Sequence, residues 1–149
     1  MAQNGYNCSM THLPGTAAPQ RRSATSRWRT AGLVFIFLWF AIGGTAHFVA
    51  TEAEMRIVPP WFPWPRAAVL VSGVFELIGA AGLLWAPTRR LAGIGLLLLT
   101  LAVTPAHIYM LQQPELFSVP YGLLVARLPL QLALLVLIAW VTLARTGNG

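Results

Sequence analysis

Ionisable side chains lie inside otherwise apolar stretches of this chain, where each of them needs a partner. A charged group at the centre of a membrane-spanning helix costs about 2.5 to 3.5 kcal/mol. Such groups therefore usually pair with one another, bind a ligand or relay protons. The residues concerned, together with two polar neighbours that share their helical faces, are His47, Glu76, Thr104, His107, Arg127 and Gln131.

Glu76 is the most demanding of these residues, because it lies in the middle of residues 67–86, a stretch that is otherwise uncharged. On a helix, the face that carries Glu76 also carries Gly73 and Gly79. Small residues allow a second helix to approach closely. This face should therefore point into a helix bundle, and Arg127, in the last apolar stretch, is the cation that we expect to pair with Glu76.

Three interpretations of these residues are open. In the first, Glu76 and Arg127 form a buried ion pair that fixes the helix register, while His47 and His107 cap helix ends. In the second, the residues line a polar cavity that binds a ligand or relays protons. In the third, His47 and His107 are axial ligands of a haem, which two histidines alone do not establish. The sequence contains no nucleophile with its base, no nucleotide-binding loop and no set of metal ligands, so the catalytic residues stay unknown and no metal site is predicted.

The elements that must position these residues are transmembrane helices. The chain has 149 residues, of which 56% are hydrophobic and 9% charged, a composition typical of an integral membrane protein. Residues 30–51 carry no acid, lysine or arginine, and as a helix they would span roughly 33 Å, enough for the hydrocarbon core. The basic residues flank the apolar stretches and are not interleaved with exposed aromatics, which argues against nucleic-acid binding. The sequence predicts an all-α, four-helix transmembrane bundle, with helices at residues 30–50, 67–86, 91–111 and 123–143.

The arginines predict the orientation of this bundle. Most of the ten basic residues, all of them arginine, lie before the first apolar stretch, between the second and third, or after the fourth. Positive residues favour the cytoplasmic side, so both termini should be cytoplasmic. With the helix directions fixed in this way, His47, Glu76, His107 and Arg127 all fall in the outer half of the bundle.

The segments outside the helices are polar or rich in proline. Residues 1–27 should be a disordered, basic, cytoplasmic tail, residues 28–145 the membrane domain, and residues 146–149 a polar tail. A cleaved signal peptide is the alternative for the first helix, and a twin-arginine export signal is the alternative at Arg21 and Arg22.

Residues 51–66 connect the first two helices and contain several prolines with Trp61, Phe62 and Trp64 in their second half. Proline excludes a regular helix there, and aromatic residues beside a span are typical of the membrane interface. We expect this loop to lie against the lipid headgroups; a lid over a binding site is the alternative.

A combination of short motifs resembles the DoxX-like family of small bacterial membrane proteins, over residues 31–144. This resemblance implies a four-helix bundle in the cytoplasmic membrane of a bacterium. The motifs are His47-Phe48, Val58-Pro59-Pro60-Trp61, Ser72-Gly73-Val74-Phe75-Glu76-Leu77-Ile78-Gly79, Pro105-Ala106-His107 and Arg127-Leu128-Pro129-Leu130-Gln131.

The resemblance also implies a function. The protein that gives the family its name is a subunit of a thiosulfate:quinone oxidoreductase, and relatives accompany redox enzymes or assist the maturation of other proteins. By this resemblance we expect an auxiliary subunit of a quinone-linked redox system, not a complete enzyme, with a redox enzyme or client protein as its partner besides the lipid bilayer. A quinone or a small anion is the expected ligand. The alternative function is a non-redox assembly factor or a small transporter.

Overall fold

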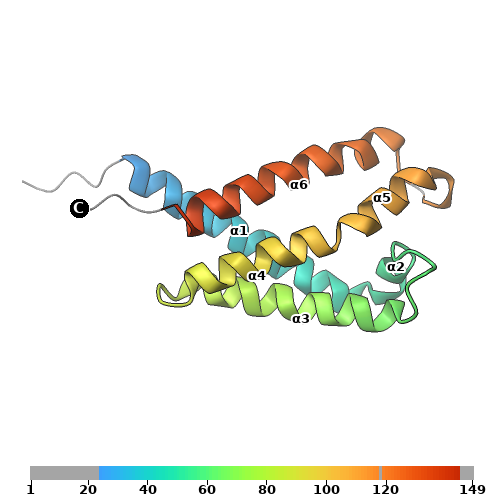
Figure 1. The fold of residues 1–149 in the computed structure, drawn as a ribbon, viewed down its shortest axis with the longest axis horizontal. Coiled ribbons are helices and arrows are strands. Elements are labelled where there is room, and N and C mark those ends of the chain that lie inside the picture. Colours follow the sequence, from blue (N-terminus) through green and yellow to red (C-terminus); the bar gives the residue numbers. More distant parts are fainter. Residues whose placement is uncertain (1–23, 118, 145–149) are drawn as a thin grey trace, which may run out of the picture.

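The computed structural model describes residues 24–117 and 119–144 of the chain, and within them every regular element is helical (Figure 1). The predicted all-α fold class is therefore confirmed. The elements are α1 (Ala24–Val49), α2 (Thr51–Met55), α3 (Pro65–Leu84), α4 (Arg89–Ala102), α5 (Thr104–Gln112), the 3-10 helix η1 (Pro114–Leu116) and α6 (Tyr121–Thr142).

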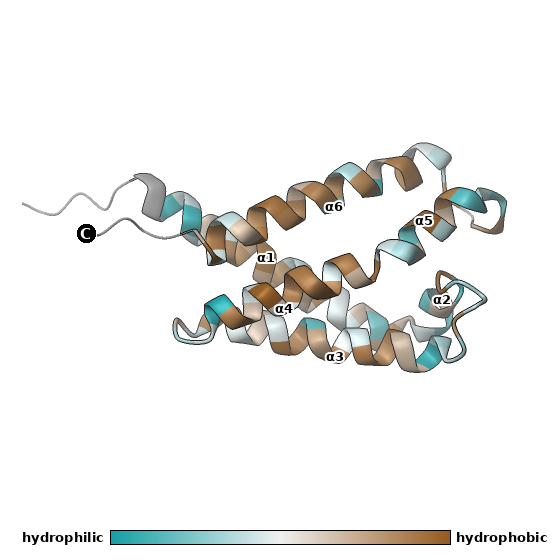
Figure 2. Cartoon of the chain, viewed as in Figure 1, coloured by the Kyte–Doolittle hydropathy of each residue, from teal (hydrophilic) through white to brown (hydrophobic). Residues whose placement is uncertain are grey.

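Four spans are long and apolar enough to cross a membrane, as predicted: Arg27–Val49, Pro65–Leu84, Arg89–Gln112 and Tyr121–Thr142. Apolar residues predominate along all four of them (Figure 2). Large apolar side chains stay exposed on these spans, for example Leu98, which is 63% exposed. Such a surface is stable in a lipid bilayer and unfavourable in water. The chain is thus a multi-pass membrane protein, while the cytoplasmic placement of both termini stays a prediction.

The first helix begins earlier than the sequence predicted. α1 starts at Ala24, so residues 24–27, assigned to the tail, belong to the helix. No glycine or proline stands between Ala24 and the apolar part of the span that would stop the helix there. The rest of the predicted tail, with Cys8 and the Arg21–Arg22 pair, lies outside the described residues, as does the polar segment 146–149.

The helices pack so that α4 lies between α3 and α6. α3 packs against α1 and α4, while α6 packs against α4, α1 and α5 (Figure 1). The apolar core lies where all four spans meet, toward the end that carries the α3–α4 turn. It consists of Ile36, Phe40, Ala80, Leu83, Leu96, Leu134, Ile138 and Val141.

The contact between α1 and α3 is close because both helices present glycine. A Cβ added at Gly44 would lie 3.1 Å from the carbonyl oxygen of Gly73, and a Cβ at Gly73 would lie 3.1 Å from the carbonyl oxygen of Gly44. Such approach of two helix backbones is the usual role of small residues in membrane bundles. At the core end, Arg29 of α1 donates hydrogen bonds to the carbonyl oxygens of Trp140 and Ala144, at 3.2 and 2.5 Å, and these bonds tie α1 to the end of α6.

The third span is broken, whereas the sequence predicts one helix at residues 91–111. α4 ends at Ala102, and α5 begins at Thr104 with Pro105 in its first turn. Proline has no N–H to donate to the carbonyl of Leu101, and its ring disfavours a continuous helix at that point. The break changes the direction of the span next to the polar residues of α5 (Figure 1).

Candidate functional site

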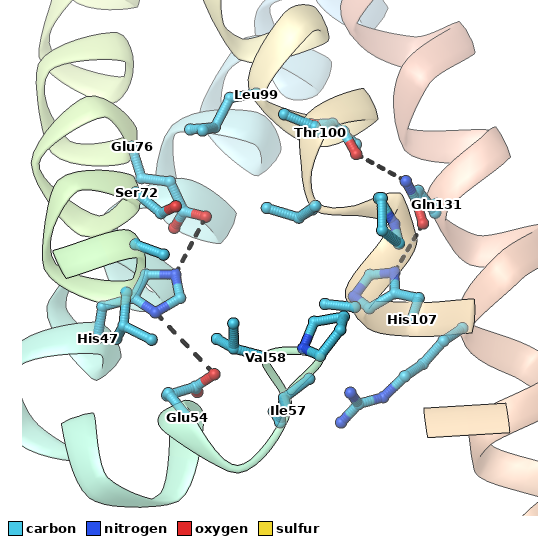
Figure 3. A pocket seen from close by; sticks show the side chains of 18 of the residues that line it. His47, Glu54, Ile57, Val58, Ser72, Glu76, Leu99, Thr100, His107 and Gln131 are labelled. Carbon is cyan, nitrogen blue, oxygen red and sulfur yellow. Dashed lines mark hydrogen bonds and ion pairs between the residues drawn. The ribbon is translucent and has the colours of Figure 1, made fainter. Parts of the chain in front are cut away.

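A cavity of about 540 Å³ occupies the end of the bundle opposite the core. One wall comes from α1, α2 and α3, and the other from α4, α5 and α6 (Figure 3). Residues 57–59, 61 and 62, which follow α2, also line it, so this proline-rich loop contributes to the cavity. Most lining residues are apolar, and the polar ones form two groups on opposite walls.

The first polar group is centred on His47, near the end of α1. Its Nε2 atom lies 3.4 Å from Oε1 of Glu76 on α3, and its Nδ1 atom lies 4.0 Å from Oε2 of Glu54 on α2. Gly43 makes room for the acid, because a Cβ there would lie 2.9 Å from Oε2 of Glu76. A histidine held by a carboxylate has a fixed ring orientation and can take up a proton.

The Nδ1 atom of His47 is buried and has no hydrogen-bond partner among the described residues. Glu54, at 4.0 Å, is too distant for a hydrogen bond. A buried polar atom without a partner costs about 1 to 3 kcal/mol, so its presence at the cavity wall calls for a structural or functional explanation.

The second polar group connects α4, α5 and α6. Nδ1 of His107 lies 2.7 Å from Oε1 of Gln131, and Nε2 of Gln131 donates to the carbonyl oxygen of Thr100 at 2.7 Å and to Oγ1 of Thr104 at 2.8 Å. Gln131 is only 8% exposed. The buried amide of Gln131, on α6, thus forms hydrogen bonds to both helices of the broken third span and orients His107 at the edge of the cavity.

The predicted ion pair between Glu76 and Arg127 is wrong. Among the described residues, the ion-pair partner of Glu76 is His47, and Arg127 donates from Nη1 to the sulfur of Met110 at 3.2 Å. The reason is the helix order: α4 lies between α3 and α6, so the two residues belong to opposite walls of the cavity.

The structure therefore sorts the candidate residues into two groups instead of one. Five of the six line the cavity, namely His47, Glu76, His107, Arg127 and Gln131. The sixth, Thr104, does not line it but accepts a hydrogen bond from Gln131. A thioether sulfur is a weak acceptor, so Arg127 keeps most of its donor capacity for other groups.

Sequence reasoning missed Glu54, which it placed in an outer loop. A signal for its position exists in the spacing: α2 follows α1 after Ala50, so His47 and Glu54 are seven residues apart in nearly continuous helix, which places them on one face. It also missed that the carbonyl of Thr100 would take part. No group of three or more His, Cys, Asp and Glu that could hold a metal ion occurs in the described part of the chain.

The family described as a domain of unknown function, DUF8561, matches residues 36–144. The chain belongs to this family. The match runs from the middle of α1 to just past the end of α6, so it includes the whole cavity and both polar groups. No curated protein and no solved structure matches the chain at a significant level.

Proposed function

We propose that this protein binds a quinone-like molecule in the cavity and serves as an auxiliary membrane subunit of a quinone-linked redox system. The observation that carries the proposal is a mostly apolar cavity with histidine-centred polar groups on opposite walls. Ligand sites in proteins have this character: a concave apolar surface of about 300 to 1,000 Å³ with a few placed polar groups.

A quinone suits this arrangement because of its own shape. Its ring is flat and apolar and carries oxygen atoms at opposite ends, so the ring can lie between the apolar walls while its oxygens meet polar groups at both sides. Arg127 supplies N–H donors, since its own acceptor is the thioether of Met110. His47, held by Glu76, supplies a site for a proton.

The resemblance to the DoxX-like family supports the same function. The motifs that carry the resemblance contain His47, Glu76, His107, Arg127 and Gln131, the same residues that line the cavity. In this proposal the protein lies in the cytoplasmic membrane of a bacterium, both termini are cytoplasmic, and the cavity is in the outer half of the membrane. Its partner is a redox enzyme or a client protein.

The test compares two phenylalanine substitutions on neighbouring residues of α3. Ser72→Phe places a large ring in the cavity, whereas Val71→Phe, at a residue that is 51% exposed, places it toward lipid. Each protein is purified in nanodiscs from the native membrane, and the extracted quinones are quantified by mass spectrometry. We expect quinone with the wild type and with Val71→Phe, and little with Ser72→Phe. Equal amounts in both variants would show that the quinone is only surrounding lipid, and would refute the proposal.

The broken third span favours a second candidate, a small transporter. Discontinuous helices beside a central cavity are typical of transporters, because their unwound backbone binds substrate, and the break at Val103 lines this cavity. Proteoliposomes that contain the purified protein separate the two functions. A transporter moves its substrate across a sealed membrane, whereas an auxiliary subunit binds quinone without net movement of a polar solute.

A further inference from the structure

Hydrogen bonds that lead from the backbone carbonyl of Thr100 through the Gln131 amide determine which ring nitrogen of His107 carries the proton. The oxygen of Thr100 can only accept a hydrogen bond, so the group of Gln131 that lies 2.7 Å from it must be the NH₂ group. The orientation of the Gln131 amide is thus determined by its surroundings.

The second hydrogen of this NH₂ group is also engaged. Thr104 donates its hydroxyl hydrogen to the carbonyl of Thr100 at 3.3 Å, and its Oγ1 atom accepts from Gln131 at 2.8 Å. The oxygen of the Gln131 amide must then face His107. An amide oxygen accepts only, so Nδ1 of His107 donates in the 2.7 Å contact.

A neutral imidazole has one donor nitrogen and one acceptor nitrogen. With the proton held on Nδ1, the Nε2 atom of His107 carries a lone pair. His107 lines the cavity, and Figure 3 shows its ring at the cavity edge, with one ring nitrogen bonded to Gln131 and the other directed away from it. The ring therefore offers the cavity an acceptor and no donor.

We propose that His107 selects ligands that carry a hydroxyl or N–H group, and that the cavity therefore binds a hydroquinone in preference to the corresponding quinone. This inference rests on the proposed function and names which form of the ligand the site takes. Gln131 is the positioning residue, since it acts on the ligand only through His107.

The preference follows from what each ligand oxygen can do. A hydroquinone hydroxyl donates to Nε2 of His107 and can still accept from Arg127. A quinone oxygen can accept from Arg127 but has no hydrogen to donate to the lone pair on Nε2 of His107, so this nitrogen loses its hydrogen bond to water without replacement. The carboxylates of Glu54 and Glu76 on the opposite wall are acceptors as well when ionised, so the second hydroxyl also finds an acceptor there.

The binding test uses a decyl-substituted 1,4-benzoquinone and the matching hydroquinone. Each is titrated under anaerobic conditions into the full-length protein in nanodiscs at pH 8. We expect the hydroquinone to bind at least about tenfold more tightly. Equal binding, or tighter binding of the quinone, would overturn the inference and leave the proposed function standing. Binding of neither form would overturn both.

Two substitutions show whether the preference runs through Gln131. Gln131→Leu removes the acceptor that holds the proton on Nδ1 of His107, so the ratio of the two dissociation constants should fall to within about threefold. Thr104→Val is the matched control: it removes one acceptor of the same amide, but the carbonyl of Thr100 still fixes the amide orientation, and the ratio should stay high. A ratio that is unchanged in Gln131→Leu would contradict the role of Gln131.

NMR of the unsubstituted protein shows directly which ring nitrogen of His107 carries the proton. In ¹⁵N NMR of protein labelled at histidine, a ring nitrogen that bears a proton shows the one-bond coupling to it, and a bare nitrogen does not. His107→Gln identifies the His107 signals by their loss. We expect the coupling at Nδ1 and none at Nε2. The reverse assignment would overturn the inference even if Gln131→Leu fails to fold.

Discussion

Gly73→Ala should weaken the bundle, because Gly73 lies at a close contact between α1 and α3. A Cβ at this position would lie 2.8 Å from Cβ of His47 and 2.9 Å from Cε2 of Phe48, whereas carbon atoms at optimal contact are about 3.5 to 4.0 Å apart. The Phe48 ring can rotate, but Cβ of His47 is attached to the backbone of α1. The two helices must therefore separate by roughly 1 Å, which also pulls His47 from Glu76.

The magnitude follows from two opposing effects. Alanine gains about 1 kcal/mol over glycine in a helix interior, and overpacking of a close contact costs about 1 to 3 kcal/mol. Gly95→Ala on α4 is the matched control, because an added Cβ there meets nothing within 4 Å. Relative to this control, Gly73→Ala should lower the free energy of unfolding by about 1 to 3 kcal/mol.

The assay is reversible unfolding in mixed micelles with increasing sodium dodecyl sulfate, followed by circular dichroism. Both variants have the same chemical change and the same helical environment, so the propensity gain cancels in their difference. If the Gly73→Ala protein is as stable as the Gly95→Ala protein, α1 and α3 do not cross at Gly44 and Gly73. This result would refute the placement of His47 beside Glu76.

Three further results are expected. In double-mutant cycles of the unfolding free energy, His47→Gln and Glu76→Gln should show a coupling energy above about 0.5 kcal/mol. The effects of Glu76→Gln and Arg127→Leu should instead add to within about 0.5 kcal/mol. The opposite pattern would restore the predicted Glu76–Arg127 pair. Arg29→Ala should lower the unfolding free energy by about 1 to 2 kcal/mol, because the carbonyl groups at the end of α6 lose the cation that donates hydrogen bonds to them. The control Arg27→Ala, measured by the same unfolding assay, should change it by less than about 0.5 kcal/mol. Equal losses in the two variants would contradict the contact between Arg29 and α6. Reporters fused to the carboxyl end and inserted in the α3–α4 turn should report cytoplasm, and one in the α5–α6 connection the outer side; reversed signals would invert the proposed topology.

The spans could be predicted from the sequence because the bilayer imposes both a length and a composition on each helix. The boundaries were less accurate where no such constraint acts. Ala24 begins α1 in a polar segment that hydropathy does not describe. The break at Val103 was within reach of the sequence, because Pro105 lies inside the predicted helix 91–111. A proline in a membrane helix can produce a kink or a break, however, and the residue alone does not say which.

The candidate residues could be predicted as a set, whereas their partners could not. Depth along the membrane follows from helix direction and residue number, so His47, Glu76, His107 and Arg127 were expected at one end of the bundle, and all four line the same cavity. The order of the helices around the bundle does not follow from depth. Because α4 lies between α3 and α6, Glu76 contacts His47 and not Arg127.

A photoreactive quinone would show whether a ligand binds in this cavity. The probe is a 1,4-benzoquinone with a diazirine on its alkyl chain, incubated with the protein in nanodiscs, irradiated, and mapped by peptide mass spectrometry with and without an excess of the unlabelled quinone. We predict labelling of the α2–α3 loop near Val58 and of α5 near His107, suppressed by the excess. The lipid-facing groove of α6 around Leu132 and Val136 provides the contrast: labelling confined to that groove, or labelling that excess quinone does not reduce, would contradict the account.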